Sequence, residues 1–222
     1  MSNNSKLLRL NRSIIRCKKC PRLSMYIHEV AKNKVKRFKN QKYWGKPLTG
    51  FGDFTAKLLI VGLAPAAHGG NRTGRMFTGD SSGDWVAKTL FDNGFASQKN
   101  SDNKNDGFQL FGAYITAAVR CSPPENKPTK EEFENCSVFL EQEFEILKNV
   151  KTIVCLGHIA YSSTCKLLQI KKTPFSHGKI IHEKGIKIIC SYHPSRQNTQ
   201  TGRLTWEQWD MIFKTAKKLT SV

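Results

Sequence analysis

Four of the seven cysteines have the spacing of a metal or cluster site. Cys17 and Cys20 form a C-x-x-C pair followed by proline, whereas Cys121 and Cys136 stand alone much later in the chain. Four thiolates can hold a 4Fe–4S cluster or a zinc ion, and a redox pair beside two unrelated buried thiols is the third possibility. Zinc ribbons usually supply two C-x-x-C pairs, so the two isolated cysteines favour a cluster. The other three cysteines lie in apolar segments, which predicts core positions.

Polar segments that could carry chemistry follow four short apolar runs. The runs span residues 57–61, 113–119, 152–156 and 186–191, and the polar segments span residues 62–80, 120–128, 157–158 and 192–198. The apolar runs are typical of buried strands. The carboxyl ends of parallel strands share one edge of a sheet, where ligands bind in such folds. We therefore expect these polar residues to form a single site.

Helical patterns separate the strands. Helices are expected over residues 5–16, 22–39 and 82–95, after Gly157, and from Thr129 and Thr205, with a further short strand at residues 179–183. Glu132 and Gln208 follow the two threonines at capping-box spacing. Alternating strands and helices predict an α/β fold, a three-layer α/β/α sandwich with a central, mostly parallel sheet. The length of 222 residues fits a single domain over residues 1–222.

The chain is strongly basic. It has 36 Lys and Arg against 17 Asp and Glu, a net charge of +19 that is spread along the sequence. Such an excess favours a nucleic-acid partner, with a compositional bias as the alternative. No apolar run is long enough for a membrane span and no signal peptide is evident, so we expect a cytoplasmic protein, monomeric and without membrane contact.

These motifs together resemble the uracil-DNA glycosylase superfamily, and most closely its iron–sulfur type-b class, the fifth family. The resemblance rests on the cysteine pattern and on residues 62–80, 119–128 and 192–198, and it extends from Cys17 to about Thr205. It implies excision of uracil from DNA without a lyase step. It also implies a structural 4Fe–4S cluster on Cys17, Cys20, Cys121 and Cys136.

The sequence departs from the superfamily pattern in its first motif. Ala66 stands where glycine is usual, and Met76 where proline is more usual. Many uracil glycosylases also carry an Asp, Asn or Glu there to activate water, whereas residues 64–67 of this chain contain no carboxylate. The type-b class resembles this sequence in that absence.

The resemblance assigns roles in base excision. Breaking the bond between base and sugar develops positive charge on the sugar and negative charge on the base, so a donor and a carboxylate are needed. His193 is expected to donate to the base, and Asp80 to orient water or stabilise the cation, or else only to cap the helix that follows. Phe77 is expected to stack on the extruded base, or else to pack in the core.

Further residues complete the expected site. Asn126 could contact the base or the water, or serve only as a turn residue. Ala64, His68 and Asn71 lie in the first loop and are expected near the substrate. Arg196 and Gln197 follow the histidine motif and are expected to enter the duplex, or else to contact phosphate alone.

Two alanines bear on substrate range. Relatives with strict uracil selectivity place an asparagine in the second-strand segment, where this chain has Ala117 and Ala118. A methyl group cannot read the edge of a base, and small alanines leave room for a larger ring. We therefore expect hypoxanthine, xanthine or an etheno-cytosine adduct to be excised as well as uracil.

Two other functions compete with this one. A non-catalytic iron–sulfur module that binds DNA fits the missing first-motif carboxylate. A nucleotide-binding protein fits the Gly-rich segment 69–74, although that segment lacks the Gly-Lys-Ser/Thr ending of a phosphate-binding loop.

Overall fold

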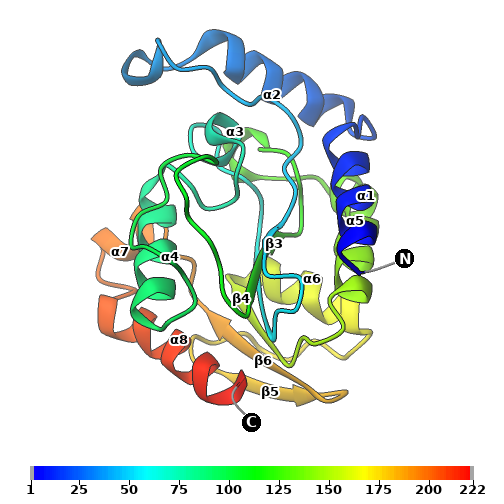
Figure 1. Ribbon diagram of the computed structural model, residues 1–222, viewed down its shortest axis with the longest axis vertical. Helices are drawn as coiled ribbons and strands as arrows, with labels where there is room; N and C mark the ends of the chain where they lie inside the picture. Colours follow the sequence, from blue (N-terminus) through cyan, green and yellow to red (C-terminus); the bar gives the residue numbers. More distant parts are fainter. Residues whose placement is uncertain (1–2, 221–222) are drawn as a thin grey trace.

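The computed structural model describes residues 3–220 and contains one six-stranded sheet (Figure 1). The strand order is β1-β3-β2-β4-β6-β5. The central strands β3 (Ala113–Ala117), β2 (Leu58–Gly62), β4 (Thr152–Leu156) and β6 (Ile186–Ser191) are parallel. The edge strands β1 (Phe51–Gly52) and β5 (Ile180–Glu183) pair antiparallel. The predicted fold class is confirmed.

Helices cover both faces of the sheet because alternate residues of each central strand point to opposite sides. Leu59 and Val61 pack with α1 (Asn3–Ile15), α2 (Pro21–Asn33), α5 (Lys130–Ile146) and α6 (His158–Leu168). Leu58 and Ile60 pack with α4 (Ser81–Asp92) and α8 (Trp206–Thr220). The two hydrophobic clusters make the three layers that the strand and helix alternation predicts.

The capping boxes lie where the sequence predicts them. Thr129 accepts a hydrogen bond from the backbone of Glu132, whose carboxylate accepts one from the backbone of Thr129. Thr205 and Gln208 make the same reciprocal pair before α8. No helix within residues 3–220 is both long and apolar enough to cross a membrane.

The structure differs from the prediction in the segment after α2. The helix expected to reach residue 39 ends at Asn33, and the chain continues through the short 3-10 helix η1 (Lys36–Phe38). Distant contacts decide this, because the guanidinium of Arg72 lies 3.8 Å from the ring centroid of Phe38 and donates to Gln41 Oε1 at 2.6 Å. Three short helices were also unexpected: α3 (Gly70–Thr73), η2 (Pro124–Asn126) and α7 (Arg196–Gln200).

Candidate active site

A cavity of about 650 Å³ lies at the carboxyl ends of the central strands. Loops that follow β2, β3 and β6 line it, as the sequence predicts, whereas residues 157–158 after β4 do not. Seven of the predicted site residues lie in its wall: Ala64, His68, Phe77, Asp80, Asn126, His193 and Arg196. The strand topology therefore brings these separate motifs together.

Phe77 is held in an unusual backbone conformation. Its φ is 48°, in the left-handed region that residues with a side chain rarely adopt. Its ring lies over Gly62, where a Cβ would come within 2.7 Å of it, and its centroid is 5.9 Å from that of the His193 ring. The glycine at the end of β2 thus leaves room for an aromatic face at the cavity.

Asp80 caps α4 and also faces the cavity. Its Oδ1 accepts a hydrogen bond from the backbone N–H of Gly83 at 2.9 Å. Its Oδ2 packs so closely on Gly69 that a Cβ there would lie 1.8 Å from it. Burial raises the pKa of the Asp80 carboxyl, against the lowering effect of backbone N–H groups and of nearby arginines. The structure therefore gives Asp80 the capping role and also places it in the cavity wall.

The imidazole of His193 is neutral at physiological pH. Burial lowers its pKa to about 4, so the imidazole carries no charge near pH 7. Its backbone is fixed, because Asn198 Nδ2 donates to its carbonyl at 2.8 Å and Ser82 Oγ donates to the carbonyl of Pro194 at 2.9 Å. The second contact joins the loop after β6 to the first turn of α4, which carries Asp80.

Asn126 lies at the exposed mouth of the cavity. Both Asn126 and Glu125 have positive φ, 57° and 53°, in the short helix η2. The turn is closed by the backbone N–H of Asn126, which donates to the carbonyl of Pro123 at 3.2 Å. This tight turn directs the segment after β3 toward the cavity.

Not every residue predicted in the loop after β2 lies in the cavity wall. His68 lines the cavity with its Nδ1 3.1 Å from the Tyr43 hydroxyl, and burial lowers its pKa. Asn71 is fully buried outside the cavity wall, and its Nδ2 donates to the carbonyl of Ile27 in α2 at 3.2 Å. The expectation that Asn71 contacts substrate is therefore corrected: the helix α3 turns it toward the protein interior.

Arg196 begins the exposed helix α7 and reaches the cavity wall, where its Nε donates to Ser81 Oγ at 3.3 Å. Gln197, one residue later, is exposed and does not line the cavity.

Ala117 and Ala118 do not line the cavity either. Ala117 packs in the same hydrophobic cluster as Ala113 and Ile115, and Ala118 N–H donates to the carbonyl of Gly62 at 2.9 Å. The argument that these alanines enlarge the base pocket is therefore wrong.

Among the cavity-wall residues that sequence reasoning missed, Tyr26 and Arg37 come from outside the predicted motifs. They come from α2 and η1, which Figure 1 shows crossing one end of the molecule near α3. Neither residue belongs to a recognisable motif, because both lie in stretches with an ordinary amphipathic pattern.

The four cysteines of the predicted cluster site pack on the same face of the sheet as α1, α2 and α5. Cys17 follows α1, Cys20 precedes α2, Cys121 follows β3 and Cys136 lies in α5. The thiols are close enough for their charges to interact, and burial, with the neighbouring thiols, raises the pKa of Cys121 and of Cys136, the latter to about 11. Within residues 3–220, however, no three Cys, His, Asp or Glu side chains converge on a point that one metal ion could occupy. The donor set is all sulfur, the ligand type that iron–sulfur clusters take.

The chain is similar to proteins of known family along most of its length. A model of the uracil DNA glycosylase superfamily matches residues 49–217. A type-5 uracil-DNA glycosylase of Mycobacterium leprae is 45% identical over 96% of this chain and 95% of the relative. One of Pyrobaculum aerophilum is 42% identical over 91% and 88%, respectively. A type-4 uracil-DNA glycosylase of Archaeoglobus fulgidus is 28% identical over 83% and 79%. The resemblance predicted from the motifs is thus confirmed, and the chain belongs to the uracil DNA glycosylase superfamily.

Proposed function

We propose that this protein is a uracil-DNA glycosylase that hydrolyses the bond between uracil and deoxyribose in DNA, the first step of base excision repair. The observation that carries the proposal is the arrangement of three groups in one cavity: an aromatic ring, a neutral imidazole and a carboxylate. The names of the similar proteins support the same activity. The non-catalytic alternative loses its support, since Asp80 supplies the carboxylate that the first motif lacks.

Each group has a distinct task in this mechanism. The extruded uracil stacks on Phe77, because a base in the duplex is out of reach of the enzyme. His193 donates an N–H to a uracil carbonyl oxygen as negative charge develops on the departing base. The Asp80 carboxylate orients water and stabilises the cationic sugar. Asn126 at the mouth contacts the base or this water.

The direct test is release of free uracil from a duplex with one U·G pair, with abasic sites detected by alkaline cleavage. We expect release without strand cleavage by the protein itself. A hypoxanthine duplex run alongside tests the wider range: the cavity wall carries the small side chains of Ala64, Ala66 and Ala67, which favours room for a purine. Tight duplex binding with no released base would instead support the non-catalytic module.

Arg196 is proposed to contact DNA beside the cavity, together with Gln197. The high positive charge should make affinity fall steeply with salt, because bound counterions are released. We expect Arg196→Ala to weaken binding to a uracil duplex more than to an undamaged one. A loss that is equal for both duplexes, with the salt slope reduced by about one unit, would reduce its role to a phosphate contact.

Cys17, Cys20, Cys121 and Cys136 would hold a 4Fe–4S cluster of structural role. When bound, such a cluster supplies four iron–thiolate bonds that join segments distant in sequence. The anaerobically purified protein should be brown and contain about four iron atoms per chain. Cys136→Ala should lose iron and stability, whereas Cys165→Ala, also at a buried cysteine, should keep its iron. Stoichiometric zinc in a colourless protein would contradict the cluster.

A further inference from the structure

The left-handed backbone conformation of Phe77 must be held by contacts outside the cavity. A residue with a side chain keeps a φ of 48° only where the surroundings hold it there. On the cavity side its ring meets Gly62 and the ring of His193, neither of which hydrogen-bonds to its backbone. The residues on either side of it, Met76 and Thr78, are both buried, and of the two only Met76 lines the cavity.

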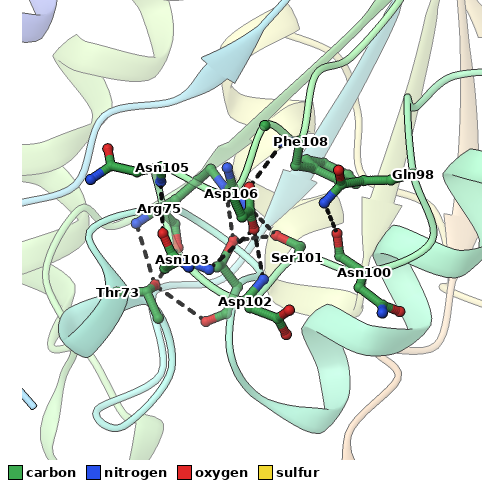
Figure 2. Close-up of polar contacts among 12 residues, drawn as sticks. Thr73, Arg75, Gln98, Asn100, Ser101, Asp102, Asn103, Asn105, Asp106 and Phe108 are labelled. Atoms are coloured by element: carbon green, nitrogen blue, oxygen red, sulfur yellow. Dashed lines mark hydrogen bonds and ion pairs between the residues drawn. The ribbon is translucent and has the colours of Figure 1, made fainter.

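A buried polar network lies beside the turn that carries Phe77 (Figure 2). Arg75 Nη2 donates to Ser101 Oγ and to Asp106 Oδ2, each at 2.7 Å, and Arg75 Nε donates to Thr78 Oγ1 at 3.0 Å. Thr78 Oγ1 lies 2.7 Å from Ser101 Oγ and donates to the Met76 carbonyl at 3.1 Å. Thr78 and Ser101 are 0% and 1% exposed, so water cannot replace these bonds.

The hydroxyl hydrogens in this network can be placed by counting. Thr78 has one hydroxyl hydrogen, and the Met76 carbonyl has none to offer, so Thr78 donates to it. Ser101 therefore donates to Thr78 Oγ1, and its own oxygen accepts from Arg75. The order of donation then runs from Arg75 through Ser101 and Thr78 to Met76.

The last hydrogen bond of this chain is to the peptide group whose orientation sets the φ of Phe77. The Met76 carbonyl belongs to the peptide that joins Met76 to Phe77, so fixing its oxygen fixes one side of the rotation about the N–Cα bond of Phe77. On the other side of Phe77, the side chain of Thr78 is itself held, because its Oγ1 accepts from Arg75 Nε at 3.0 Å. Contacts at both neighbouring residues therefore hold the strained residue.

The same network continues to Asp80. The backbone N–H of Gly79 donates to the carbonyl of Ser101 at 2.9 Å, and the carbonyl of Gly79 accepts from Arg72 Nη2 at 2.6 Å. Gly79 directly precedes Asp80. The N–H and the carbonyl of Gly79 are therefore both hydrogen-bonded, which fixes the backbone on the N-terminal side of Asp80.

The far end of the network is a surface loop. The carboxylate of Asp106 accepts backbone hydrogen bonds from Asp102, Asn103 and Phe108 while it pairs with Arg75. The Arg75 and Asp106 side chains are only 7% and 9% exposed. Loop residues 101–108, which line no part of the cavity, are thereby joined to the turn that carries Phe77 and Asp80.

We propose that Thr78 and Ser101, held by Arg75 and Asp106, are positioning residues that fix Phe77 and Asp80 for base excision. The inference rests on the proposed function, because excision is one of its two readouts. Neither Thr78 nor Ser101 touches the substrate cavity, so their effect on the reaction must pass through the turn.

Three matched variants test this role. Thr78→Val keeps the shape of the side chain and removes its hydroxyl, while Thr78→Ser keeps the hydroxyl. Thr89→Val is the control, because Thr89 is also 0% exposed and its hydroxyl donates to Asp210 Oδ1 at 3.2 Å, away from the cavity. Each is measured for single-turnover uracil release at saturating enzyme, for duplex affinity, and for the NMR resonance of the His193 ring proton, identified by its loss in His193→Gln.

We expect Thr78→Val to lower the single-turnover rate about tenfold or more with affinity little changed, since small misplacements of reacting groups are costly. It should also shift the His193 resonance, because the nearby Phe77 ring moves. Thr78→Ser and Thr89→Val should leave both near the wild type. If Thr78→Val fails to fold, Ser101→Ala removes the neighbouring hydroxyl and should show the same pair of effects.

The proposal is overturned if Thr78→Val matches Thr89→Val in both readouts, or if Thr78→Ser is as impaired as Thr78→Val. Wild-type protein that releases no uracil would overturn the proposed function instead, and the His193 resonance would still decide whether the network positions Phe77.

Discussion

Replacing Asp80 with asparagine lowers single-turnover uracil excision by about 100-fold or more while helix α4 keeps its cap, if the carboxylate acts as proposed. Asparagine is as good a helix N-cap as aspartate, so its side-chain oxygen can still accept from the backbone of Gly83. It has no negative charge to stabilise the cationic sugar. Asp80→Asn therefore separates the two roles that the structure gives this residue.

The matched variant is Asp80→Ala, which removes both roles. We expect it to lose the same activity and, in addition, about 1 kcal/mol of stability, measured by urea unfolding. Full excision by a folded Asp80→Asn protein would leave Asp80 with its capping role alone. The carboxylate for the reaction would then have to come from elsewhere in the cavity wall, where Glu125 is the remaining candidate.

His193→Gln is expected to reduce single-turnover excision on the order of 100-fold with less effect on duplex binding, because the hydrogen bond to the base strengthens only as charge develops. Glutamine keeps a donor of similar reach but different direction. An excision rate near that of the wild type would show that the direction of this donor is unimportant and would point to Asn126 as the group that contacts the base.

His193 also predicts a pH dependence with a definite sign. Its pKa is about 4 in the folded protein against about 6.5 in an unfolded chain, so between these values the unfolded state binds more protons. Stability should therefore fall as the pH drops from about 6.5 toward 4, and His193→Gln should lack this part of the loss. Unfolding curves of both proteins across this range provide the measurement. Identical pH profiles would mean that the pKa of His193 in the native protein is close to that in an unfolded chain.

The sequence predicts the central strands well because they are short, mostly apolar runs bounded by polar or Gly-containing segments, as buried strands are. It also predicts the convergence of Phe77, Asp80 and His193, since parallel strands bring the loops at their carboxyl ends together. The orientation of individual side chains is harder. Asn71 looks like a loop residue, yet one turn of helix α3 buries it against Ile27.

The buried position of Ala117, in contrast, could have been predicted from the sequence. It lies two residues after Ile115 in the same strand, and both pack in one hydrophobic cluster, as the two-residue period of a strand requires. The segment after α2 is different. Its path depends on Arg72, more than thirty residues later, and no local pattern records that contact.

The residues of the cavity wall come from two parts of the chain, one inside and one before the region that matches the superfamily model. Phe77, Asp80 and His193 lie within the matched residues 49–217, whereas Tyr26 and Arg37 precede them. Hydrogen bonds from Asn71 to Ile27 and from Arg72 to Gln41 fasten the earlier segment to the later one. The superfamily model thus covers the residues proposed for the reaction, whereas the type-5 relatives, which match up to 96% of the chain, also match most of the segment before it. Exchanging residues 21–48 with those of a more distant relative should therefore change DNA binding more than the rate of excision itself.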